Sequence, residues 1–132
     1  MANTKWVQIS IYVPMGNAEA VRTALADAGA GRLGNYSGAS WSTTGVGRFT
    51  PMEGANPTIG AVGVPSDVPE HKIEVLAPRE IARSVVEAAI AAHPYEEPAY
   101  YVTDVYIASP GIAFRRNRPQ PVLRAGGGLR RR

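Results

Sequence analysis

Residues 5–13 read KWVQISIYV, and every second side chain in this stretch is aliphatic. The aliphatic positions are Val7, Ile9, Ile11 and Val13. Because successive side chains of a β-strand point to opposite faces of a sheet, the alternation predicts a strand with one apolar face. Pro14 and Gly16 follow directly, and they predict the end of the strand.

A helix is predicted over residues 18–28, immediately after this strand. Asn17 is a favourable N-cap residue, and Gly29 suits the position just beyond a helix C-terminus. Between them, apolar residues recur at the spacing of an amphipathic helix. This apolar stripe consists of Val21, Ala24, Leu25 and Ala28.

The same order of elements occurs again in the second half of the chain. Residues 71–76, HKIEVL, predict a short strand, and Pro78 suits the start of a helix over 79–92. Pro94 disfavours helical backbone at the residue before it, so the helix is expected to stop there. Residues 99–108, AYYVTDVYIA, predict the last strand.

Glycine and small polar residues dominate the segment between these two halves. Residues 36–44, YSGASWSTT, predict a strand of small side chains, and residues 45–49 continue it after a turn. We expect residues 50–69 to form a long ordered loop, because apolar side chains such as Ile59 are spaced through it and can pack on the domain.

The order strand–helix–strand–loop–strand–helix–strand predicts an α+β, ferredoxin-like βαββαβ fold with both helices on one sheet face. The opposite face is left uncovered and carries Trp6 and tyrosines, so we expect a homo-oligomer that covers it. The predicted domain spans residues 1–112. Residues 113–132 are rich in arginine and predict a flexible tail.

Charge is distributed unevenly along the 132 residues. Residues 1–114 carry seven basic and 11 acidic side chains, whereas residues 115–132 carry seven arginines and no acid. Such a basic tail can contact the phosphates of RNA or an acidic surface. No aromatic residue lies among the arginines of residues 115–132 to stack on bases, so nucleic-acid binding is kept only as an alternative.

Composition excludes several classes of function. The chain has no cysteine, which rules out disulfides, cysteine-ligated zinc, iron–sulfur clusters and a thiol nucleophile. Only His71 and His93 are available as nitrogen ligands or general bases. No apolar run approaches the roughly 20 residues of a membrane span, and the first residues show no signal-peptide pattern. We therefore expect a cytoplasmic protein without membrane contact.

The most informative local motif is HPYEEP at residues 93–98. Its prolines fix the backbone on both sides, so an imidazole, a phenol and two carboxylates are held in one turn. Such a turn can bind a divalent cation through His93, Glu96 and Glu97, or seat a polar small molecule. The alternative is structural: His93 caps the preceding helix, and the glutamates are solvated or form ion pairs.

Two further groups give weaker signals. The segment 31–37, GRLGNYS, is compatible with backbone amides that approach an anion, or with glycines that serve a turn. Glu70 and Glu74 share one face of a strand and His71 lies on the other, which weakens His71 as a co-ligand. No nucleophile-elbow pattern accompanies the serines, so a Ser-His-Asp triad has no support.

Three groups of motifs, in this order, resemble one known family. They are GNYS at 34–37, GVGRFTP at 45–51 with GANPTIG at 54–60, and EHKIE at 70–74 followed by HPYEEPAY at 93–100. Together they resemble the YqfO-type domain in a standalone form. That domain is otherwise inserted in the dinuclear-metal, GTP-cyclohydrolase-type-2-like proteins. The resemblance covers about residues 5–108.

The resemblance implies a PII/CutA-like fold and, by analogy, a homotrimer, with ligands bound in clefts between subunits. The residues alone do not decide between a trimer and a dimer. It also implies the residues that line such a cleft, namely Asn35, Tyr36, Glu74, His93, Tyr95, Glu96 and Glu97. The family's dinuclear metal site lies in a separate catalytic portion for which this chain has no room, so cyclohydrolase activity is not implied. Ala39 stands where the family commonly has a cysteine, which removes one soft ligand.

These observations lead to one expected function and two alternatives. We expect a non-enzymatic module that binds or senses a small molecule or a divalent cation as a small homo-oligomer. One alternative is a regulatory or structural partner protein that uses the basic tail. The other is an enzyme in which His93 and a glutamate act as general base. The sequence points to no cofactor beyond a divalent cation.

Overall fold

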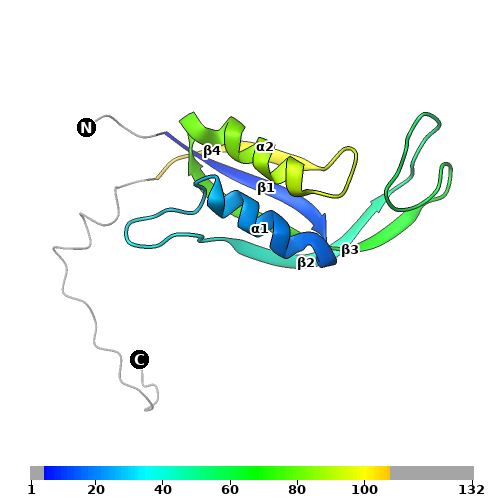
Figure 1. The fold of residues 1–132 in the computed structure, drawn as a ribbon, viewed down its shortest axis with the longest axis horizontal. Helices are drawn as coiled ribbons and strands as arrows, with labels where there is room; N and C mark the ends of the chain where they lie inside the picture. The colour runs from blue at the N-terminus through cyan, green and yellow to red at the C-terminus, as the bar shows by residue number, and fades with distance from the viewer. Residues whose placement is uncertain (1–4, 108–132) are drawn as a thin grey trace, which may run out of the picture.

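Four antiparallel strands form one sheet in the order β2-β3-β1-β4, and two helices lie across one of its faces (Figure 1). The structure is a computed structural model, and it describes residues 5–107. The strands are β1 (Trp6–Pro14), β2 (Trp41–Phe49), β3 (Ser66–Pro78) and β4 (Tyr100–Val105). The helices are α1 (Ala18–Asp27) and α2 (Ala82–Ala92), each preceded by a short 3-10 turn, η1 (Met15–Asn17) and η2 (Arg79–Ile81). The predicted α+β, ferredoxin-like fold is confirmed.

The hydrophobic core lies between the helices and the sheet. All four aliphatic residues of β1 face it and are fully buried, as their alternation predicts. β3 lies beside β1 in antiparallel register, with Ile73 opposite Ile11 and Val75 opposite Ile9. The helices close the core with Val21 and Leu25 of α1, and with Val85 and Ala89 of α2.

Each helix begins after a proline that ends the preceding strand. Pro14 and Pro78 have nearly the same backbone angles, and each leads into a 3-10 turn rather than directly into the α-helix. Asn17 stands at the N-cap of α1 but makes no side-chain capping hydrogen bond, so its predicted capping role is not seen. Gly29 takes a φ of 111° just past α1, where an L side chain is strained, as predicted.

β2 and β3 form a longer hairpin than the sequence predicts. The strand predicted over 36–44, with a turn before 45–49, is wrong in both respects, because β2 runs unbroken from Trp41 to Phe49. β3 begins at Ser66 and pairs along its whole first half with β2, so the connecting loop is only residues 50–65. Pairing with a neighbouring strand outweighs the weak strand propensity of small residues there.

The predictions for the C-terminal part of the chain can be compared with the structure only as far as residue 107. β4 is shorter than the predicted strand over 99–108. The arginine-rich tail predicted over 113–132 lies outside the described residues. Neither α1 nor α2, the helices of residues 5–107, has the length and apolarity to cross a membrane.

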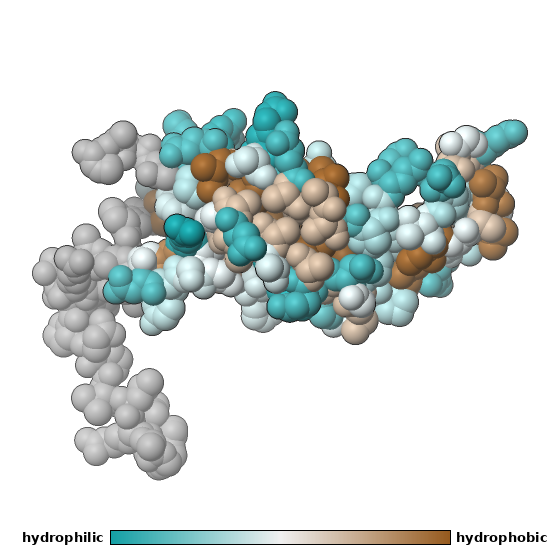
Figure 2. Space-filling model, viewed as in Figure 1, coloured by the Kyte–Doolittle hydropathy of each residue, from teal (hydrophilic) through white to brown (hydrophobic). Residues whose placement is uncertain are grey.

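Exposed hydrophobic side chains occur on two surfaces, the sheet face opposite the helices and the extension of the β2–β3 hairpin. The sheet face away from the helices is not covered within this chain, and it exposes Trp41 and Tyr101. Beyond it, the hairpin of β2 and β3 extends outward, and Figure 2 shows hydrophobic surface gathered on this extension. Its exposed hydrophobic residues are Val46, Met52, Val62 and Val64.

Candidate functional site

The turn after α2 is organised around a buried histidine. His93 is 8% exposed and has an extended backbone, which ends the helix at Ala92. Its Nε2 lies 2.6 Å from the carbonyl oxygen of Tyr12, and its Nδ1 accepts the backbone N–H of Tyr95 at 3.1 Å. A carbonyl only accepts, so Nε2 carries the proton and the ring is neutral. Both ring nitrogens are therefore used to hold the turn against β1.

Burial lowers the pKa of His93, while the bond to the Tyr12 carbonyl and the negative charge of Glu70 act in the opposite direction. The neutral ring is thus the form that the surroundings favour. His93 does occupy the C-cap position of α2, where its backbone N–H donates to the carbonyl oxygen of Ile90, but its ring bonds to β1 and to its own turn. Within residues 5–107, no three His, Asp or Glu side chains are grouped to hold a metal ion.

A buried tyrosine–glutamate pair lies beside this turn. The Tyr95 hydroxyl donates to Oε2 of Glu70 at 3.2 Å, and Glu70 is only 7% exposed. Burial and the neighbouring Glu70 charge raise the pKa of Tyr95 to about 12. The Phe49 ring packs edge-on against Tyr95, with ring centroids 5.7 Å apart. Strand β2 makes room for the pair, because a Cβ on Gly47 would collide with the Glu70 carboxyl group.

The long loop between β2 and β3 is fastened to the same turn. Thr58 Oγ1 donates to the carbonyl oxygen of Pro94 at 2.7 Å, and the Asn56 N–H donates to Oε1 of Glu96 at 3.1 Å. In Figure 1 this loop and the turn after α2 lie at the same end of the sheet. The expectation of an ordered loop that packs on the body is met for residues 50–65.

These segments surround a pocket of about 740 Å³. Its aromatic walls are Tyr12, Phe49, Tyr95 and Tyr101, and its ionisable walls are Arg48, Glu53, Glu70, Glu96 and Glu97. The remaining wall is the loop itself, from Thr50 to Ile59. A volume of this size is typical of sites for small organic molecules.

The structure brings together only some of the predicted cleft residues. Tyr95, Glu96 and Glu97 line the pocket, and His93 supports the turn that carries them. Glu74 lies on the uncovered sheet face, paired with Lys72 at 3.0 Å, and borders a smaller neighbouring hollow of about 410 Å³.

Asn35 and Tyr36 do not join this group within one chain. Both are exposed, in the loop between α1 and β2. Figure 1 places that loop at the opposite end of the sheet from the turn after α2. A cleft that uses all seven predicted residues therefore requires a second subunit.

Several pocket residues were not singled out from the sequence. Glu70 was placed on the same strand face as Glu74, which is correct, but its burial was not foreseen. Tyr12 and Phe49 had no signal as site residues. The small residue at position 47 was the one available hint, because a glycine in a strand marks a close approach.

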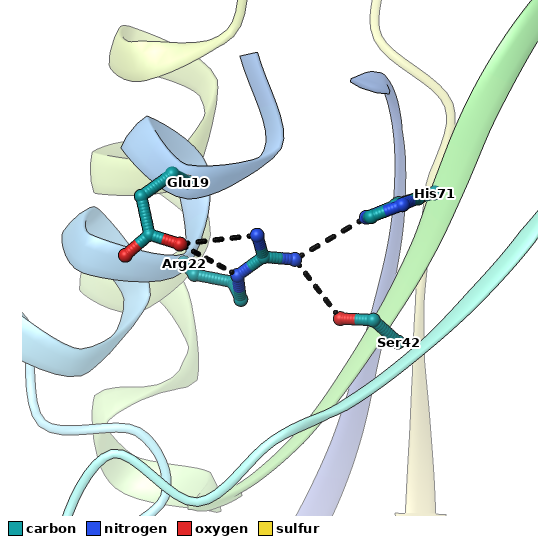
Figure 3. Close-up of polar contacts among 4 residues, drawn as sticks. All are labelled: Glu19, Arg22, Ser42 and His71. Atoms are coloured by element: carbon teal, nitrogen blue, oxygen red, sulfur yellow. Dashed lines mark hydrogen bonds and ion pairs between the residues drawn. The ribbon is translucent and has the colours of Figure 1, made fainter. Parts of the chain in front are cut away.

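His71 belongs to a different cluster, on the helix side of the sheet (Figure 3). Arg22 Nη1 lies 3.3 Å from His71 Nδ1 and donates to Ser42 Oγ at 3.1 Å. The same guanidinium is paired with Glu19 at 3.0 Å. Because an arginine only donates, His71 accepts through Nδ1 and joins β3 to α1. His71 and Glu70 thus face opposite sides of the sheet, as predicted.

No protein-family model matches the sequence. Curated proteins named GTP cyclohydrolase 1 type 2 homolog do match it. The Mycobacterium tuberculosis protein is 45% identical over 125 residues, which cover 89% of this chain and 31% of the relative. The Bacillus subtilis protein is 43% identical over 99 residues, covering 75% and 26%. This chain corresponds to one portion of those proteins. It spans about a third of their length or less.

Solved structures agree with this match and extend it to the fold. A Bacillus cereus protein related to NIF3 has a TM-score of 0.70 and 40% identity, covering 80% of this chain and 27% of that one. CutA1 from Shewanella sp. SIB1 has a TM-score of 0.59 at 15% identity, covering 90% and 100%. A B. subtilis GlnK–ATP complex has a TM-score of 0.54 at 12% identity, covering 80% and 85%. The fold is therefore CutA- and PII-like.

Proposed function

We propose that the chain is a non-enzymatic binding module that holds a small ligand between the loop 50–65 and the turn 93–98. The observation that carries this proposal is the 740 Å³ pocket with the buried carboxylate of Glu70 in its wall. Among the described residues, that carboxylate has one hydrogen-bond partner, the Tyr95 hydroxyl. Buried charges are normally paired, so a ligand that completes the pairing fits this wall.

Binding is favoured over catalysis by the state of His93. A general base needs a ring nitrogen within reach of the substrate proton. Both nitrogens of His93 are engaged, one with Tyr12 and one with Tyr95. We therefore assign the ligand contacts to Tyr95, Glu70, Glu96 and Glu97, and give His93 the role of positioning their turn. The divalent-cation set His93, Glu96 and Glu97 would require the ring to give up one of these bonds.

Proteins of the same fold support a binding role by analogy. A CutA from Archaeoglobus fulgidus is named a divalent cation tolerance protein, and a GlnK of B. subtilis was solved as a complex with ATP. Their identity to this chain is 17% and 12%, so the likeness concerns the fold alone. Function belongs to the site rather than to the fold, and the ligand must be argued from this chain.

We further propose that the module works as a homotrimer. The sheet face opposite the helices exposes Trp41 and Tyr101, which a second copy would cover. The hairpin extension adds exposed hydrophobic side chains such as Met52 and Val64. A neighbouring subunit is also the means by which Asn35 and Tyr36 could reach a pocket that they do not line in their own chain.

Native mass spectrometry of the full chain tests this function. The probes are manganese(II), Mg-ATP and the diamine putrescine, each compared with the protein alone. We expect a trimer that keeps one probe in stoichiometric amount. Replacing both Glu96 and Glu97 with Gln should remove the adduct and leave the trimer intact, whereas Glu87→Gln on the exposed side of α2 should change neither. A protein that takes up none of the three probes would contradict the proposal, and loss of the trimer in the double variant would make the turn structural.

A further inference from the structure

We propose that the ligand of this pocket is an organic cation, a small molecule that carries a protonated amine or a guanidinium group. The inference rests on the proposed binding function and specifies its ligand class. Three features of the pocket lead to it: the acidic side chains of its wall, the burial of one of them, Glu70, and its aromatic walls.

The pocket wall is strongly acidic. Four carboxylates line it, from Glu53, Glu70, Glu96 and Glu97, against the single guanidinium of Arg48. Arg48 is itself paired with Asp67, outside this lining, whose Oδ1 lies 2.8 Å from Nε. Walls of one charge sign raise the local concentration of ligands of the opposite sign. The wall therefore attracts cations and repels phosphates and carboxylates.

The Glu70 carboxylate is the group in this wall to which a cation would bind. It is more than nine-tenths buried, yet its partner among residues 5–107 is a neutral hydroxyl and not a cation. Its second oxygen, Oε1, has no hydrogen bond to any described residue. The carboxyl group fills the space left by the missing side chain of Gly47, at a point where both residues line the pocket. An ammonium or guanidinium N–H placed there would complete the pairing that a buried carboxylate requires.

The aromatic walls suit an organic cation. Tyr12 and Tyr101 meet edge-to-face at 6.1 Å, and Phe49 and Tyr95 meet edge-to-face at 5.7 Å. All four rings line the same pocket as Glu70. Aromatic rings attract organic cations through their π-faces and also cover the attached carbon chain. Carboxylates combined with aromatic rings are thus the composition that recognises an alkylammonium or guanidinium group.

An inorganic cation fits the pocket less well. Its 740 Å³ is far more than a single ion needs, and lies within the usual range for small organic ligands. The described part of the chain offers no cluster of three His, Asp or Glu side chains for a metal. One Glu96 oxygen is already bound by the Asn56 amide.

Isothermal titration calorimetry at low ionic strength provides the test, with the full chain and a matched pair of probes. Putrescine carries two ammonium groups, and butanediol has the same length without charge. We expect putrescine to bind and butanediol not to bind. Glu70→Gln keeps an acceptor for the Tyr95 hydroxyl but removes the charge, and should weaken putrescine binding about ten- to hundredfold. Glu87→Gln should leave the affinity unchanged.

The outcomes separate this inference from the proposed function. Binding of manganese(II) or Mg-ATP without putrescine would overturn the organic cation and leave a binding module. Equal binding of putrescine and butanediol, or full affinity in a folded Glu70→Gln variant, would also overturn it. If Glu70→Gln does not fold, the pair Glu53→Gln and Glu96→Gln must lower the putrescine affinity for the inference to stand. Absence of binding by every probe would overturn both.

Discussion

The chain contains two strand–turn–helix units that begin alike and end differently. In one, β1 ends at Pro14 and leads through η1 to α1. In the other, β3 ends at Pro78 and leads through η2 to α2. The φ and ψ angles of the two prolines agree within a few degrees, at −54° and 142° against −59° and 140°. Each helix then begins with an alanine and lays an aliphatic stripe on the same sheet face.

The units diverge at the C-termini of their helices. After α1, Gly29 reverses the chain, and the loop that follows contributes nothing to the pocket. After α2, His93 extends the backbone and starts the turn that supplies Tyr95, Glu96 and Glu97. The β2–β3 hairpin extension, which has no counterpart next to β1, supplies the opposite wall. The features that the two units share thus form the core of the fold. The segments in which they differ, the turn after α2 and the hairpin extension, form the walls of the pocket.

The largest effect is expected from the shared scaffold. Leu25 is a fully buried residue of α1 that packs in the common core. Leu25→Ala should lower the free energy of unfolding by about 2–5 kcal/mol, because it removes methyl groups and leaves a cavity. Chemical denaturation followed by circular dichroism measures it. Glu97→Gln, in the divergent turn, should stay within about 0.5 kcal/mol of the parent, and an equal loss there would break the division into scaffold and site.

The next effect tests whether His93 holds the divergent turn. His93→Gln disturbs the bonds to the Tyr12 carbonyl and the Tyr95 amide and should cost about 1–3 kcal/mol at neutral pH. The pKa of His93 is lower in the folded state than its ordinary value of 6.5. Just below pH 6.5 the unfolded chain is therefore protonated at His93 to a greater extent than the folded chain. Stability contributed by the neutral ring is therefore present above about pH 6.5 and is lost as the pH falls.

Thermal melts between neutral and mildly acidic pH measure this dependence. The parent should lose stability below pH 6.5, and His93→Gln should lose less of it over the same interval. His71→Gln is the control, because His71 lies in the separate Arg22 cluster and makes none of the contacts of the turn after α2. An unchanged acid-side loss in His93→Gln would show that another group causes it.

The sequence predicted the scaffold better than the site for a physical reason. Regular alternation in β1 and helical spacing around Leu25 are local signals, and both elements lie where the pattern places them. β2 has no such signal, because its small residues are exposed along most of its length and its limits are set by pairing with β3. The local sequence pattern therefore does not predict where a strand begins and ends when its pairing with a neighbouring strand sets those limits.

The walls of the pocket were predicted only in their contiguous part. HPYEEP identified Tyr95, Glu96 and Glu97 because proline fixes neighbouring residues in one turn. The bond from Thr58 to the Pro94 carbonyl joins residues 36 apart, and no local pattern encodes it. Glu70 was expected on a strand face, but carboxylates are rarely buried. Strand pairing places Glu70 opposite Gly45, and its carboxyl group reaches along β2 to Gly47, which no local pattern encodes.

A matched pair of glycine variants tests whether strand register shapes the pocket. Neither Gly45 nor Gly47 has a positive φ, so alanine is sterically allowed by the backbone at both positions. A Cβ on Gly45 meets nothing within 4 Å, whereas a Cβ on Gly47 would collide with the Glu70 carboxyl group. Gly47→Ala should lower putrescine affinity about tenfold by displacing that carboxylate, and Gly45→Ala should not change it. Equal affinities by calorimetry would show that Glu70 does not contact the ligand.

The smallest effect concerns the Tyr95 hydroxyl. Tyr95→Phe removes one hydrogen bond to Glu70 and should cost about 1 kcal/mol of unfolding free energy at neutral pH. The folded state raises the pKa of Tyr95 from 10 to about 12. Between these values the unfolded chain loses a proton that the folded chain keeps, so the contribution of Tyr95 to stability is lost as the pH rises from 10.

Ultraviolet titration of the folded protein reports this proton directly, because tyrosinate absorbs where tyrosine does not. The ionisation of Tyr95 should occur near pH 12, and this step should be absent in Tyr95→Phe. A late step that survives in Tyr95→Phe would assign the proton to another tyrosine and would separate Tyr95 from the Glu70 wall.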